Sequence, residues 1–173
     1  MNPLPIHPAI VHLPLGLAFV MPAVAIGLAW AIWTGRLQPR AWVLVAVLQA
    51  VLLAGGVAAR ATGEHDEDRV ERLVPDASLE RHEALATQFL GITGATLAAA
   101  LFAVVFRRPV VRQTLAAATI VGTVLVTVAA IRVGHAGGQL VYQHNAGAAY
   151  ATGATVTPPE EARRGGDDEA GRR

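Results

Sequence analysis

Six histidines carry most of the chemistry that this chain of 173 residues could perform. Imidazole is the commonest metal ligand in proteins and also an axial ligand of haem iron. The chain contains no cysteine, which excludes disulfides, thiolate metal sites and a thiol nucleophile. The available chemistry is therefore imidazole ligation, by a set that comprises His7, His12, His65, His82, His135 and His144.

The elements that hold these histidines follow from the placement of charge. Only 16% of the residues are charged, whereas soluble domains average about 25%. No Asp or Glu occurs in residues 1–63 or 84–159, which leaves four long apolar runs. Each run is long enough to cross a hydrocarbon core of about 30 Å as a helix. The pattern argues against a soluble single-domain enzyme and predicts membrane spans over residues 10–33, 41–59, 84–106 and 113–131.

The predicted fold is an all-α, four-helix transmembrane bundle formed by residues 1–156. Residues 60–83 alternate charged and apolar side chains, as expected for an outer amphipathic loop. An outer element rich in His and Gly is expected at residues 132–150. Residues 157–173 are polar and rich in Pro and Gly, and we expect a disordered tail there.

Arginines in the two short loops predict the orientation. One loop contains Arg36 and Arg40, and the other contains Arg107, Arg108 and Arg112, with no acid in either. The positive-inside rule places such loops in the cytoplasm. Both termini and the acidic 60–83 loop are then expected outside an inner, or plasma, membrane. The chain's surroundings are the lipid bilayer, and nothing in the sequence suggests a nucleic-acid surface.

This topology places all six histidines at the outer end of the bundle. His12 lies within the first apolar run and is expected to be the most buried of them. His7 precedes a proline, which disfavours helical geometry, so an extended entry segment is expected there. His135 and His144 are nine residues apart and would face opposite sides of a continuous helix, unless Gly137 and Gly138 interrupt it. His65 stands among charged residues and is expected to be solvated.

Charged neighbours could complete a site. Glu83 adjoins His82 and could ligate a metal or orient an imidazole. Arg60 and Arg132 lie near the outer ends of the second and fourth spans, where they could hold haem propionates in charge-assisted bonds. Alternatively, both arginines simply reach the lipid headgroups. The sequence contains no phosphate-binding loop, His-Glu-x-x-His motif or nucleophile elbow, so we assign no catalytic residue.

Three segments resemble one bacterial family. They read HPAIVHLPLGL, TGEHDEDRVERL…ERHEA and GHAGGQLVYQHNAG, and they are similar in order and content to the four-span membrane proteins of domain of unknown function 2231. The resemblance covers residues 4–150 and departs at Asn145, where the family pattern has Gly. Relatives of this kind are sometimes joined to Rieske-type domains, which implies an electron-transfer setting.

Three functional hypotheses follow. The first is an electron-transfer protein that binds haem b near the outer leaflet, with His12 and either His82 or His135 as axial ligands and with Arg60 and Arg132 at the propionates. The second is a membrane protein that binds a non-haem transition-metal ion. Its candidate ligands are His7, His12, His82, Glu83, His135 and His144. The third is a cofactor-free structural subunit. In each case a redox or membrane-complex partner would dock at the outer face.

Overall fold

The computed structural model describes residues 7–70, 74–144 and 146–150, and within these ranges every regular element is a helix. The elements are α1 (His7–Ile10), α2 (His12–Trp33), η1 (Pro39–Trp42), α3 (Val43–Val70), α4 (Asp76–Val105), α5 (Pro109–Tyr142) and η2 (Ala146–Tyr150). Helices α2, α4 and α5, and η1 with α3 as far as Glu64, are long and apolar enough to cross a membrane. The predicted all-α class and the four spans are thus confirmed.

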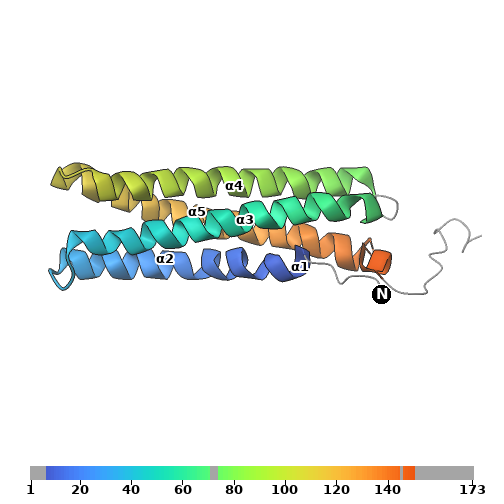
Figure 1. Cartoon of the computed structure of the whole chain (residues 1–173), viewed down its shortest axis with the longest axis horizontal. Helices are drawn as coiled ribbons and strands as arrows, with labels where there is room; N and C mark the ends of the chain where they lie inside the picture. The colour runs from blue at the N-terminus through green and yellow to red at the C-terminus, as the bar shows by residue number, and fades with distance from the viewer. Residues whose placement is uncertain (1–6, 71–73, 145, 151–173) are drawn as a thin grey trace, which may run out of the picture.

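The long helices form a closed ring in which each packs on its neighbours in sequence. Helix α4 contacts α3 and, most extensively, α5, while α2 contacts both α3 and α5. Figure 1 shows the four helices running nearly parallel, with the α2–α3 and α4–α5 turns together at one end. Helix α1, the start of α4 and the end of α5 lie at the opposite end. We call these the arginine end and the histidine end.

Many of the buried core residues are small, and many large apolar residues face outward. The buried core includes Ala18, Ala25, Ala100, Ala103, Ala129 and Ala130. Phe19, Val51, Phe102, Leu125 and Ile131 are instead about half exposed. Small residues let membrane helices approach closely, while lipid solvates the larger side chains. The packing therefore fits a lipid bilayer as the surrounding solvent.

The helices extend further than the expected spans at the histidine end. Helix α3 continues to Val70 and α4 begins at Asp76, so most of the expected 60–83 loop is helical. Helix α5 passes through Gly137 and Gly138 to Tyr142 without interruption. A helix need not end where the hydrocarbon ends, because its internal hydrogen bonds remain satisfied in water. The expected disordered tail at 157–173 lies outside the described residues.

The entry segment differs from the sequence expectation. His7 is the first residue of α1 rather than part of an extended segment. Proline is tolerated in the first helical turn, where an amide hydrogen would have no intrahelical partner, so Pro8 permits this start. The break between α1 and α2 falls at Val11, three residues before Pro14. Pro14 has no amide hydrogen to donate to the carbonyl of Ile10, and its ring crowds that carbonyl, which explains the break.

Candidate functional site

The histidine end brings together two imidazoles from opposite parts of the sequence. His7 belongs to α1, which packs on α3, and His82 belongs to α4. Both side chains are half-buried. A positive charge on His7 would oppose one on His82. The structure thus places two half-buried imidazoles at the same end of the bundle, one held against α3 and the other against α5.

The ring of His7 is fixed by a backbone carbonyl. Its Nδ1 lies 2.7 Å from the carbonyl oxygen of Ala59 on α3. A carbonyl only accepts hydrogen bonds, so Nδ1 must donate and therefore carries the proton. In the neutral form of the ring, the lone pair is then on Nε2. A ligating histidine is commonly oriented by this same arrangement, in which one nitrogen donates to a carbonyl and the other is left to bind.

Glycines allow both rings to approach the neighbouring helices closely. A Cβ atom at Gly63 of α3 would lie 3.2 Å from Cε1 and Nδ1 of His7. A Cβ atom at Gly137 of α5 would lie 3.2 Å from Cε1 of His82. Few real Cβ contacts are this short, so a side chain at either position would press on its imidazole. The absence of a side chain at Gly63 and Gly137 therefore allows the His7 ring to lie close to the backbone of α3 and the His82 ring close to that of α5.

His82 carries an unsatisfied polar atom. Its Nδ1 is buried and makes no well-aligned hydrogen bond among the described residues, although the Val133 backbone carbonyl lies close enough to accept a weak one from the ring. Buried polar atoms are satisfied in the great majority of cases, so an orphaned imidazole nitrogen calls for an explanation. One explanation is a bound ligand that accepts a hydrogen bond from the ring or is coordinated by it.

The remaining histidines have separate environments. His12 is exposed at the start of α2, which contradicts the expectation that it is the most buried. His135 is exposed on α5. His144 follows the end of α5, and its Nε2 lies 3.2 Å from the hydroxyl of Ser78, one turn before His82 on α4. For His65 only the backbone is described, within α3.

The charged residues expected to complete a site have different environments. Arg60 donates from Nε to Glu64 at 2.8 Å and from Nη1 to the hydroxyl of Thr87 at 2.7 Å, which ties α3 to α4. Arg132 is exposed on α5, and Glu83 is half-buried next to His82. Among residues with described side chains, no group of three or more His, Asp or Glu gathers closely enough to hold a metal ion.

The residues that position the pair are not evident from the sequence pattern. Gly63 and Gly137 both lie inside histidine-containing motifs, TGEHDEDR and GHAGGQL, in which the imidazoles are the obvious candidates for chemistry. The pattern predicts for Gly137 only a possible helix interruption. The useful signal is a glycine placed in a helix near a histidine of another segment, which indicates close approach of a ring to a backbone.

Comparison with known proteins agrees with this architecture. The sequence model of a family described as "Predicted membrane protein (DUF2231)" matches residues 3–150. The chain belongs to this family. The match includes all four long helices and both paired histidines, and it confirms the resemblance noted from the three motifs. No curated protein and no solved structure is significantly similar to the chain. The family description assigns an integral membrane character and no reaction.

Proposed function

We propose that this chain is a membrane-embedded electron-transfer protein that binds haem b at the histidine end, with His7 and His82 as the axial ligands. The observation that carries the proposal is that two half-buried imidazoles lie at the same end of the bundle, together with the bond from His7 Nδ1 to the Ala59 carbonyl. That bond leaves Nε2 of His7 as a Lewis base. His7 replaces His12 in the axial set expected from the sequence, because His12 is exposed.

The number of gathered ligands favours haem over a bare ion. A porphyrin supplies four nitrogens, so two axial imidazoles complete the coordination of its iron. A structural or catalytic zinc ion needs three or four protein ligands. Two half-buried imidazoles lie at this end, and no cluster of three candidate ligands occurs within the described side chains. The donor set present therefore fits haem.

The surrounding residues would hold and orient the axial pair. The Ala59 carbonyl fixes the tautomer and orientation of His7. Gly63 and Gly137 leave room for the rings against α3 and α5. Exposed Arg132 adjoins Val133, whose carbonyl lies beside His82, and is our candidate to pair with a propionate. When bound, haem would supply reversible one-electron chemistry, and a site at the end of the bundle would be accessible to a water-soluble partner.

One observation favours a second candidate, a transition-metal ion. His144 contacts Ser78, which lies one turn before His82 on α4, so a third imidazole is held on the same side of that helix. In this second candidate, His144 would join His82 as a ligand. Metal analysis of the purified protein distinguishes this candidate from haem.

The proposal is tested by absorbance spectra of the protein purified in mild detergent from haem-replete cells. We expect a Soret band and, after dithionite reduction, sharp α and β bands. His7→Ala and His82→Ala should each remove most of this absorbance. His12→Ala and His135→Ala are the matched controls, since both lie at the same end but are exposed. Absent visible bands in the wild type, or equal losses in all four variants, would overturn the assignment.

A further inference from the structure

The arginine end carries an uncompensated positive charge. Arg36 and Arg40 lie in or beside the α2–α3 turn, and Arg107, Arg108 and Arg112 lie in or beside the α4–α5 turn. Figure 1 shows both turns at the same end of the bundle. The sequence has no Asp or Glu in residues 1–63 or 84–159, so neither turn supplies a carboxylate. Anionic groups outside the chain would therefore be attracted to this end.

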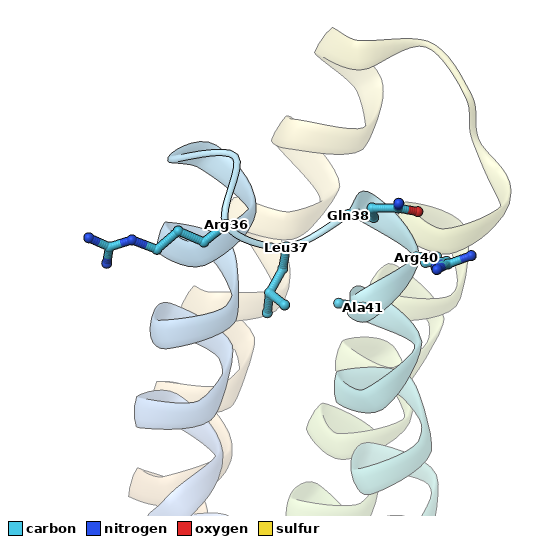
Figure 2. A pocket seen from close by; sticks show the side chains of 5 residues that line it. All are labelled: Arg36, Leu37, Gln38, Arg40 and Ala41. Carbon is cyan, nitrogen blue, oxygen red and sulfur yellow. The ribbon is translucent and has the colours of Figure 1, made fainter.

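The α2–α3 turn is shaped in a way that suits a lipid. Gly35 adopts φ +75°, a left-handed conformation that ends α2 and reverses the chain. The turn encloses a shallow hollow of about 260 Å³ lined by Arg36, Leu37, Gln38, Arg40 and Ala41. In Figure 2 Leu37 and Ala41 point into the space between the helix ends, while Arg36 and Arg40 extend to either side. An apolar floor thus lies between two cations.

An aromatic ring holds one of these cations in place. The guanidinium carbon of Arg36 lies 4.3 Å from the centroid of the Trp30 ring. Trp30 is 51% exposed, and neighbouring Trp33 is 82% exposed. Exposed tryptophans concentrate at the boundary between hydrocarbon and headgroups. The stacked Arg36 is therefore pre-organised at the depth where lipid phosphates lie.

We propose that the α2–α3 turn binds anionic phospholipids, whose phosphates are held by Arg36 on one side of the turn and by Arg40 on the other (Figure 2), and whose acyl chains follow the apolar surface of the adjoining helices. Guanidinium groups bind phosphate oxygens through paired hydrogen bonds. Leu37, Val43 and Leu44, each at least 43% exposed, provide apolar surface next to the turn. This site lies at the opposite end from the histidine pair and is independent of the proposed haem.

The test is native mass spectrometry of the detergent-solubilised protein titrated with phosphatidylglycerol or phosphatidylcholine. The wild type should retain phosphatidylglycerol preferentially. The double variant Arg36→Gln/Arg40→Gln should lower that retention at least five-fold. Arg107→Gln/Arg108→Gln removes the same charge from the other turn and should retain most of the binding. Equal loss in both pairs would show non-specific attraction, and no lipid preference in the wild type would overturn the proposal.

Two further measurements separate a lipid site from a simpler anion site or a folding defect. Arg36→Lys keeps the charge but loses the planar group that stacks on Trp30, so lipid retention should fall several-fold while helicity is unchanged. Inorganic phosphate should not displace the lipid, because it offers no acyl chains. Displacement by phosphate, or full retention in Arg36→Lys, would contradict the proposed mode of binding.

Discussion

The imidazole of His82 packs directly on Gly137, where an added Cβ would lie only 3.2 Å from its Cε1 atom. The part of α5 beyond the fourth predicted span therefore lies against a histidine that precedes the third. A Cβ added at Gly138, the next residue, would meet no atom within 4 Å. Adjacent glycines on one helix thus differ in whether a methyl group would disturb the candidate site.

Gly137→Ala should therefore displace the His82 ring, whereas Gly138→Ala should not. We expect Gly137→Ala to reduce the haem retained per chain at least three-fold and to destabilise the fold by about 1–3 kcal/mol, the usual cost of overpacking. The measurement is haem content per chain with thermal unfolding in detergent. Equal behaviour of the two alanine variants would show that contact with Gly137 does not position His82.

A second close contact predicts the stability of the α4–α5 pair. A Cβ at Gly122 would lie 2.5 Å from Oγ1 and 2.8 Å from Cγ2 of Thr96. Gly122→Ala should separate α4 from α5 and lower the unfolding temperature. Thr96→Ala removes both atoms, so the double variant should recover most of the loss.

The control for this prediction is Gly94→Ala on α4. No atom lies within 4 Å of the added methyl group, and alanine favours a helix over glycine by about 1 kcal/mol in water. The unfolding temperature should stay the same or rise. A fall comparable with that of Gly122→Ala would indicate that any added methyl is harmful, and the specific contact with Thr96 would lose its support.

Gln49 is a polar side chain buried in the centre of the bundle. It is 0% exposed, its Nε2 donates to the carbonyl of Thr93 at a long 3.4 Å, and its Oε1 has no partner among the described residues. Replacing a poorly satisfied polar group with an apolar one of similar shape is nearly neutral or stabilising. Gln49→Leu should change the free energy of unfolding by less than about 1 kcal/mol. A decrease in the free energy of unfolding well above this value, measured by detergent or thermal unfolding, would contradict the conclusion that the Gln49 side chain is poorly hydrogen-bonded.

The two arginines at the histidine end should differ in their importance for haem. Arg60 is engaged with Glu64 and Thr87, with its side chain 41% exposed, and exposed ion pairs contribute about 0–1 kcal/mol. Arg132 makes no ion pair with the residues that the structure describes. Arg132→Gln should weaken haem retention more than Arg60→Gln, as measured by haem loss during gel filtration. The reverse order would make Arg60 the propionate partner.

Most of the fold could be predicted from the sequence because lipid imposes a simple rule. Apolar runs without acids must be helices, and the four runs are helical in the structure. The ends of α3 and α5 could not be predicted this way, since hydropathy reports where the hydrocarbon stops and not where backbone hydrogen bonding stops. Residues 64–70 are mostly charged yet helical for this reason.

The candidate site could be predicted only in its general position. The topology predicts that histidines gather at one end, but which of them meet depends on how α1 packs against α3. Proline rules favour an extended His7, and hydropathy favours a buried His12. The structure contradicts both expectations. His7 begins a helix, because proline is accepted in the first helical turn, and its ring hydrogen-bonds to the Ala59 carbonyl. His12 is exposed.

The central claim is that two imidazoles, His7 and His82, ligate one haem. It is tested most directly by low-temperature electron paramagnetic resonance of the oxidised protein purified with its bound haem. We predict a low-spin ferric signal in the wild type that becomes high-spin, or disappears with the haem, in His7→Ala and in His82→Ala, and that persists in His12→Ala. A low-spin signal that survives the loss of either His7 or His82, or a wild-type protein without haem, would contradict the account.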